Sequence, residues 1–120
     1  MKLVVSERET DALSRHIAGA SLITSEISEV EVPRAAYLRT DAEESVRHAE
    51  AVLARFNLVP LDEEVRRAAA RSRPAGLRSL DAIHLVSCLR VARHIRSVVV
   101  YDKQLATALR AHDLRVDAPY

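Results

Sequence analysis

The sequence of 120 residues has little of several residue types that mark particular classes of protein. Its single cysteine, Cys88, excludes an internal disulfide and a cysteine-based zinc site. It has no tryptophan, and aromatic residues make up only 3% of the chain, so a platform of rings for stacking nucleobases is not expected. No apolar run approaches the length of a membrane span, and the opening nonapeptide MKLVVSERE is too short and too charged for a secretory signal. We therefore expect a cytoplasmic protein without a membrane partner.

The chain also lacks an excess of charge of one sign. Its 18 basic and 17 acidic residues leave a formal net charge of +1, which excludes a broad cationic nucleic-acid surface but not a local groove. Nearly all the basic residues are arginine, because Lys2 and Lys103 are the only lysines. Arginine suits phosphate recognition. Abundant arginine beside abundant alanine can equally reflect codon bias, and we favour that interpretation for the composition as a whole.

Helical segments alternate with short apolar segments along the whole chain. The expected helices cover residues 10–18, 25–39, 41–56, 62–72, 77–94 and 102–112. The expected strands cover residues 21–24, 57–61, 97–101 and 114–116. This alternation is typical of βαβ units, with a parallel sheet covered by helices on both faces. The length predicts a single domain over residues 1–120.

The central helix, residues 77–94, is expected to organise the domain. It is apolar on most of its circumference, which predicts burial between other elements. Ser79 is its predicted N-cap, and the loop of residues 73–76, which contains proline and glycine, precedes it. Asp62 is the predicted N-cap of the preceding helix, and residues 97–101 form the most strongly predicted buried strand.

Three acidic residues are candidates for chemistry. Asp81 lies in the first turn of the central helix, where the alternative role is a favourable interaction with the helix dipole. Asp102 directly follows a predicted strand, at the sheet edge where ligands bind in open parallel sheets, and its alternative role is an ordinary N-cap. Glu31 projects onto the predicted inward face of its helix, where a carboxylate is costly unless it is paired or bound to a metal.

The inward face predicted for that helix consists of Ile27, Val30, Ala35 and Leu38. The alternative for Glu31 is a position at the edge of this stripe, paired with Arg34 or Arg39, and Pro33 would kink the helix or delay its start. Each of the three acids lies at or near a helix start after a strand or loop, so the acids can converge at one end of the sheet. Hard divalent cations prefer carboxylate oxygen, so such a cluster suggests metal-assisted phosphodiester hydrolysis.

Three segments resemble a PIN-domain protein and, more narrowly, the VapC toxins of toxin–antitoxin pairs. They are SLDAIHL at residues 79–85, SEVEVPRA at residues 28–35 and VVVYDKQLATALRAHDL at residues 98–114. The resemblance implies an α/β fold, a three-layer α/β/α sandwich around a mostly parallel sheet. It further implies an endoribonuclease that depends on Mg²⁺ or Mn²⁺ and acts on RNA. A cognate VapB-like antitoxin and a homodimer are the partners that it implies. By motif match, Glu31, Asp81 and Asp102 carry over as catalytic acids that hold the metal.

The sequence departs from this family in two places. The family begins with a strand that ends in an aspartate, whereas Met1-Lys2-Leu3 resembles the inside of the helix that follows. We therefore expect a PIN-like domain that lacks its N-terminal strand, through a late start codon or a truncated reading frame. The rival interpretation is a catalytically inactive PIN-like module that binds an antitoxin or itself. Val100 stands where relatives often carry a hydroxyl residue, which weakens the support expected for Asp102.

The remaining polar candidates are histidines and arginines. The histidines show no metal-ligand spacing, and His84 is expected to be packed or hydrogen-bonded beside the site. Arginines flank the loop before the central helix, at Arg66, Arg67, Arg71, Arg73 and Arg78. They could bind RNA phosphates, although solvated side chains on a helix face are the default expectation.

Overall fold

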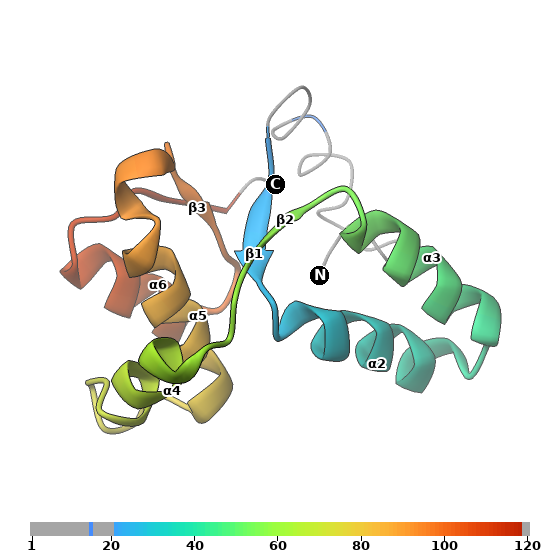
Figure 1. Cartoon of the computed structure of the whole chain (residues 1–120), viewed down its shortest axis with the longest axis horizontal. Coiled ribbons are helices and arrows are strands. Elements are labelled where there is room, and N and C mark those ends of the chain that lie inside the picture. The colour runs from blue at the N-terminus through green and yellow to red at the C-terminus, as the bar shows by residue number, and fades with distance from the viewer. Residues whose placement is uncertain (1–14, 16–20, 119–120) are drawn as a thin grey trace. The chain divides into compact units, whose positions relative to one another are not determined.

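A computed structural model of the chain describes residue 15 and residues 21–118 (Figure 1). The chain divides into two compact units, one reaching Leu58 and the other spanning Val59–Ala118. The helix expected over residues 10–18 and the segment Met1-Lys2-Leu3 lie outside the described residues, apart from Arg15, which is helical.

The first unit contains a helical hairpin and a pair of strands. Strand β1 (Ile23–Ser25) leads into helix α2 (Ser28–Thr40), and helix α3 (Glu43–Leu53) leads into strand β2 (Asn57–Val59), which crosses into the second unit. The two strands pair, and the Asn57 N–H donates to the Leu22 carbonyl at 2.8 Å. The helices lie side by side and run in opposite directions (Figure 1). Their shared core consists of Val32, Ala36, Ala49 and Leu53.

Both helices of this hairpin begin later than the sequence suggested. Ser25 belongs to β1, and its Oγ accepts a hydrogen bond from the Ile27 N–H at 3.3 Å in the turn before α2. Asp41, the predicted start of the next helix, is instead the C-cap of α2 in a left-handed conformation with φ of 54°. Its N–H donates to the Tyr37 carbonyl at 2.7 Å, so the backbone of Asp41 closes the first helix. Aspartate is among the few residues that tolerate this conformation.

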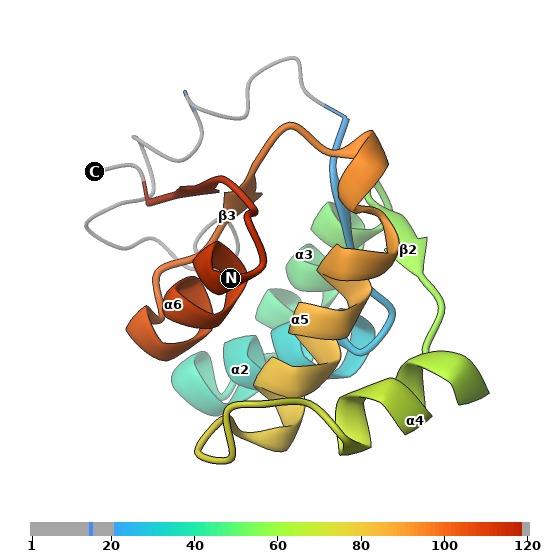
Figure 2. The same ribbon diagram turned by 90° about the vertical axis from the view of Figure 1, so that its left-hand side faces the viewer.

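The second unit contains three α-helices and a short parallel strand pair (Figure 2). In chain order it contains helix α4 (Glu63–Ala70), helix α5 (Ser79–Arg90), the 3₁₀ helix η1 (Ala92–His94), strand β3 (Val98–Val99), helix α6 (Lys103–Ala111) and strand β4 (Val116–Asp117). β3 and β4 pair in parallel, with Val98 opposite Val116. The alternation of helices and strands that the sequence predicted is therefore confirmed.

The core of this unit lies between α5 and α6. Its buried members are Leu85, Leu105, Ala108 and Leu109. Helix α5 also packs against α4, yet Leu80 and Leu89 remain exposed. Every residue from Asp81 to Cys88 is buried or half-buried, so the expectation that this helix is buried on most sides holds along its middle and fails at its two ends.

Strand β3 is shorter and less buried than predicted. Only Val98–Val99 of the expected strand at residues 97–101 is extended and paired, and both residues are half-buried. In the part of the chain that the structure describes, β4 is the one strand that pairs with β3.

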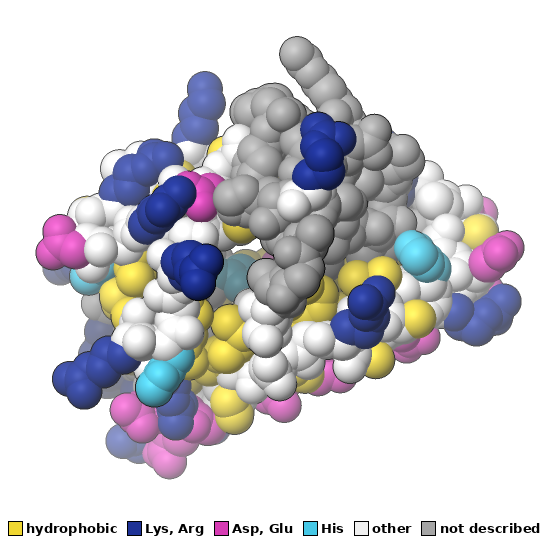
Figure 3. Space-filling model, turned by 90° about the horizontal axis from the view of Figure 1, so that it is seen from above, with side chains coloured by type: hydrophobic (Ala, Val, Ile, Leu, Met, Phe, Trp, Pro, Cys, Tyr) yellow, Lys and Arg dark blue, Asp and Glu magenta, His cyan; other side chains and the backbone are white. Residues whose placement is uncertain are grey.

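The surface carries both signs of charge. On the face drawn in Figure 3, Lys and Arg side chains are interspersed with Asp and Glu, in keeping with the net charge of +1. Among the described helices, none is both long enough and apolar enough to cross a bilayer.

Candidate functional site

Asp81 lies in the first turn of α5, and its carboxylate is mostly buried. The side chain is 17% exposed, and its Oδ2 atom is buried without a hydrogen-bond partner among the residues that the structure describes. Burying an ionised oxygen without a partner costs free energy unless a cation compensates it. A favourable interaction with the helix dipole does not supply the missing partner. This oxygen is the clearest sign of a ligand site in the second unit.

The start of α5 differs by one residue from the prediction. Arg78 is the N-cap residue in an extended conformation, and Ser79 is already the first helical residue. The Arg78 carbonyl accepts the N–H of Ala82 at 2.9 Å, which closes the first turn one residue earlier than expected. Asp81 is therefore the third helical residue, and the predicted N-cap role of Ser79 was wrong.

Arg78 places a positive charge beside Asp81. Its Nε lies 3.8 Å from Asp81 Oδ2, which is an ion pair longer than a hydrogen bond. The Arg78 side chain is 77% exposed, so solvent screens this attraction. This ion pair therefore compensates little of the cost of burying Asp81 Oδ2.

Asp102 is the N-cap of α6, the alternative role that the sequence had suggested for it. Its Oδ2 accepts the N–H of Leu105 at 2.9 Å, and the residue is exposed. A carboxylate has a second oxygen with its own lone pairs, so capping does not exclude binding a cation.

Asp81 and Asp102 lie at the starts of two helices, α5 and α6, that pack against each other through a shared apolar core. Leu85 lies one turn beyond Asp81 on α5 and packs in the same cluster as Leu105 and Leu109 of α6. Val100, which takes the place of the hydroxyl residue common in the resembling family, packs against this cluster. The support for Asp102 at that position is therefore apolar packing rather than a hydrogen bond.

Glu31 lies on α2 in the first unit and is half-buried. The inward face predicted for its helix was wrong, because Val30 is 61% exposed and Leu38 is 64% exposed. The buried face consists of Ser28, Val32, Pro33 and Ala36. The late start of α2 and the packing of α3 select this face. Glu31 thus borders the buried face rather than projecting from its centre.

Within either unit of the described chain, no group of three or more His, Cys, Asp or Glu side chains is close enough together to hold a metal ion. The second unit contributes Asp81 and Asp102, and the first unit contributes Glu31. All their donor atoms are carboxylate oxygens, the ligand type that Mg²⁺ and Mn²⁺ prefer, and Mg²⁺ often takes only one or two carboxylates with water. The unsatisfied Asp81 Oδ2 fits such an ion.

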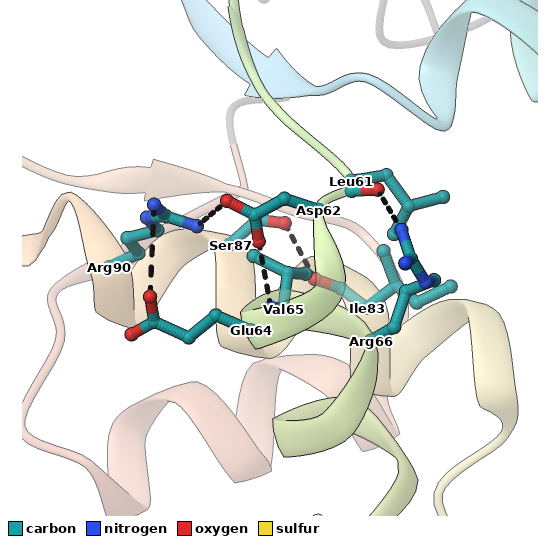
Figure 4. A network of polar contacts seen from close by, with 8 residues as sticks. All are labelled: Leu61, Asp62, Glu64, Val65, Arg66, Ile83, Ser87 and Arg90. Atoms are coloured by element: carbon teal, nitrogen blue, oxygen red, sulfur yellow. Dashed lines mark hydrogen bonds and ion pairs between the residues drawn. The ribbon is translucent and has the colours of Figure 1, made fainter.

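A network of polar side chains joins α4 to α5 (Figure 4). Asp62 caps α4 as predicted, its Oδ1 accepting the Val65 N–H at 3.0 Å. Its Oδ2 accepts a hydrogen bond from Arg90 at 2.7 Å, and Arg90 also lies 4.0 Å from Glu64. The sequence showed no sign of this partner, because Arg90 follows 28 residues later. Since Arg90 ends α5 and Asp62 begins α4, the two helices are antiparallel.

The environment of Asp62 differs from that of Asp81. The pKa of Asp62 is lowered, first by the hydrogen bond from the Val65 backbone and then by the one from Arg90. Both oxygens of Asp62 are therefore engaged in holding the two helices, whereas one oxygen of Asp81 has no hydrogen bond. We therefore assign a structural role to Asp62.

A cavity of about 560 Å³ lies along α4 and α5. Its apolar lining includes Val65, Leu85, Val86 and Leu89. Glu64 is the one carboxylate in the lining, so the cavity does not have the donors of a metal site. Cys88 packs against the nearby core, and burial raises the pKa of its thiol to about 11, which makes it a poor nucleophile.

Comparison with known proteins gives a consistent result. The family model described as PIN domain matches residues 1–110. Ribonuclease VapC35 of Mycobacterium tuberculosis (strain ATCC 25618 / H37Rv) is 36% identical over 124 residues, which cover 99% of this chain and 90% of the relative. Ribonuclease VapC46 of the same strain is 34% identical over 121 residues, covering 99% of this chain and 91% of the relative. Ribonuclease VapC47 of Mycobacterium tuberculosis (strain CDC 1551 / Oshkosh) is 34% identical over 116 residues, covering 91% and 83%.

These relatives align with both compact units, and the α/β class predicted from the sequence agrees with the matched family. The chain belongs to the PIN domain family.

Proposed function

We propose that this protein is a metal-dependent endoribonuclease toxin of the VapBC type, which hydrolyses RNA phosphodiester bonds in the cytoplasm. The observation that carries the proposal is the buried Asp81 Oδ2, which has no hydrogen bond, at the start of α5. Membership of the PIN domain family and similarity to proteins named ribonuclease VapC support it. We also propose that both compact units are parts of one PIN domain, because the family match runs through both.

Each acidic residue has a separate role in this proposal. Asp81 and Asp102 would hold a Mg²⁺ or Mn²⁺ ion from the second unit, and Glu31 would contribute from the first. When bound, the ion supplies positive charge at the scissile phosphate and makes water a better nucleophile. Asp81 offers an oxygen that is already desolvated, so it loses little hydration on binding. Asp102 is positioned by its cap bond, which fixes its carboxylate relative to α6.

The proposed partners, besides RNA, are a cognate VapB-like antitoxin and a second copy of the chain. Val30, Tyr37 and Leu38 are exposed apolar side chains on α2, and such residues favour a protein partner when they lie together. Their spacing along α2 puts Val30, Tyr37 and Leu38 near one face. This face supports a protein partner without distinguishing between the two.

The second candidate function is a catalytically inactive PIN-like module that binds an antitoxin or itself. The observation that favours it is the absence, within each described unit, of a group of three metal-ligating side chains. This candidate predicts tight partner binding without metal-dependent cleavage.

The test is cleavage of a mixed RNA pool by the purified chain, with Mn²⁺ or with a chelator. We expect cleavage only with Mn²⁺, and its loss in Asp81→Asn. The Asp102→Asn variant is expected to lose cleavage while keeping its helix, because asparagine is as good an N-cap as aspartate. Asp62→Asn is the matched control, since it makes the same change at another N-cap and should still cleave.

A second measurement reports metal binding without catalysis. Mn²⁺ should raise the thermal midpoint of the unchanged chain and of Asp62→Asn, because a ligand that binds only the folded state stabilises it. It should not raise the midpoint of Asp81→Asn. Cleavage retained in Asp81→Asn would contradict the proposed site. A folded chain that binds Mn²⁺ without cleaving any RNA would instead support the inactive module.

A further inference from the structure

We propose that the loop joining α4 to α5, residues 71–78, is the surface that binds the phosphate backbone of the RNA substrate and presents it to Asp81. This inference rests on the proposed ribonuclease function and adds a binding surface and its ligand chemistry. The loop has the sequence RSRPAGLR, with three arginines and no acid in eight residues. All three, Arg71, Arg73 and Arg78, are exposed.

The charges of these arginines are not neutralised by carboxylates at hydrogen-bond distance. Arg71 donates to the Arg67 carbonyl at 2.9 Å, which uses one of its five N–H groups and leaves its charge unpaired. Arg73 makes no hydrogen bond or ion pair with any residue that the structure describes. Within the described part of the chain, Arg78 has only the long contact with Asp81. The loop is therefore a local concentration of positive charge.

Three other arginines of the same unit are neutralised, whereas Arg66 donates only to the Leu61 carbonyl and, like Arg93, Arg96 and Arg110, has no carboxylate partner among the described residues. Arg67 pairs with Glu63 at 2.6 Å, Arg90 pairs with Asp62 at 2.7 Å, and Arg115 pairs with Asp117 at 3.3 Å. The loop differs from the rest of the unit because its three arginines lie within eight residues that include no acid, in a molecule that carries almost no net charge. A polyanion would be drawn to the cations that have no carboxylate partner.

The loop is also placed next to the candidate catalytic acid. The Asp62–Arg90 pair holds the start of α4 to the end of α5, so the loop closes the opposite end of the hairpin, where Asp81 lies. Arg78 is the N-cap of α5 and reaches within 3.8 Å of Asp81. A cation bound at Asp81 would repel the Arg78 guanidinium. The Arg78 side chain is 77% exposed and its contact with Asp81 is long, so with or without such a cation its guanidinium can donate two parallel hydrogen bonds to an adjacent phosphate, a geometry that arginine favours.

Recognition of the backbone, rather than of bases, follows from the residue types. No aromatic residue lies in the loop, so it cannot stack bases on aromatic rings. The contacts available are charge-assisted hydrogen bonds to phosphate, which carry no sequence information directly. The loop therefore supplies affinity and position for single-stranded RNA, and the choice of sequence must come from elsewhere.

Gly76 allows a direct test of the loop's charge. A Cβ atom at this position would meet no other atom within 4 Å, so a larger side chain fits without a clash. Gly76→Glu would introduce a negative charge between Arg73 and Arg78, and Gly76→Gln would add nearly the same volume without charge. We expect Gly76→Glu to weaken RNA binding and Gly76→Gln to leave it unchanged.

The closing experiment measures binding of a short fluorescein-labelled single-stranded RNA to the full chain, with chelator present so that cleavage cannot occur. Arg73→Gln and Arg78→Gln should each weaken binding by about three- to tenfold and reduce the slope of log K against log salt by about 0.7. Arg67→Gln is the matched control, because it makes the same change on α4 at an arginine already paired with Glu63. It should leave the slope unchanged.

The outcomes separate this inference from the proposed function. If the unchanged chain cleaves RNA with Mn²⁺ but the loop variants bind with unaltered affinity and slope, the inference is overturned and the function stands. If the unchanged chain neither binds nor cleaves RNA, the function fails and the inference fails with it. If the loop variants bind RNA normally but lose affinity for an acidic protein partner, the loop is a protein-binding surface and the inference is overturned.

Discussion

At the scale of single residues, aspartates near helix starts have different tasks in this protein. Asp62 uses both of its carboxylate oxygens to cap α4 and hold Arg90, whereas Asp81 has one buried oxygen without a hydrogen bond. The sequence identified both positions as near helix starts, because aspartate favours the first turn. It could not distinguish their roles, since the difference depends on how deeply each carboxylate is buried and on Arg90, which lies 28 residues after Asp62.

The pH dependence of stability should report the Asp62–Arg90 contact. The pKa of Asp62 is lowered below its ordinary value of 3.8, so its contribution to stability is present above that value and is lost as pH falls through the lowered pKa. Asp62→Asn keeps a cap but cannot form the ion pair. We expect its urea midpoint to lie below that of the unchanged chain at neutral pH, and the difference to shrink in strong acid.

Asp62→Ala separates the cap from the ion pair, since it removes both. It should be less stable than Asp62→Asn at every pH, because alanine cannot accept the Val65 N–H. Equal midpoints for the two variants would contradict a capping role for this residue.

The single cysteine should react slowly in the folded protein. Burial raises the pKa of Cys88 from 9.0 to about 11, which reduces the thiolate fraction at neutral pH about a hundredfold. Labelling with a disulfide reagent should therefore be slower by at least this factor in buffer than in concentrated urea. Labelling at equal rates would show that Cys88 is not buried in solution.

At the scale of helices and strands, the sequence predicted which elements form better than which faces they bury. Pro74 and Gly76 lie in the loop between α4 and α5, as predicted. The face of α2 was predicted wrongly, because its apolar residues lie on more than one side and only its packing on α3 selects the buried one. Strands β2 and β3 are shorter than predicted, because the extent of a strand depends on pairing with segments that are distant in the sequence.

Packing of α5 on α6 should be a major source of stability in the second unit. Leu85 is 1% exposed and contacts the α6 core, so Leu85→Ala should cost about 2–5 kcal/mol of unfolding free energy. Leu80→Ala, at an exposed position on the same helix, should change it by only about 0.5 kcal/mol. Urea unfolding of both variants measures the difference, and similar costs would contradict the assigned core.

At the scale of the whole molecule, the structure divides into two compact units, whereas a single family match runs through residues of both. The sequence predicted a single domain from its length, but length alone cannot specify how the units meet. Glu31 lies in one unit and both candidate aspartates lie in the other. If they serve one site, folding of the units should be coupled.

This coupling can be measured because the chain lacks tryptophan. Phe56→Trp would place a single fluorescent reporter at a half-buried position in the first unit, and Cys88 labelling reports on the second. We expect both probes to give the same urea midpoint, as a single cooperative domain requires. Separate midpoints would show that the units unfold independently.

The ion pair between Asp62 and Arg90 closes the α4–α5 hairpin at the end opposite its loop. The loop can therefore change without disturbing the contact that keeps the helices together, and open space around Gly76 leaves room for larger side chains or insertions. In such a hairpin, the number and spacing of positive charges in the loop can differ between related proteins. The packing of the two helices need not change with them. Exchanging this loop between related toxins would then transfer RNA affinity from one to another.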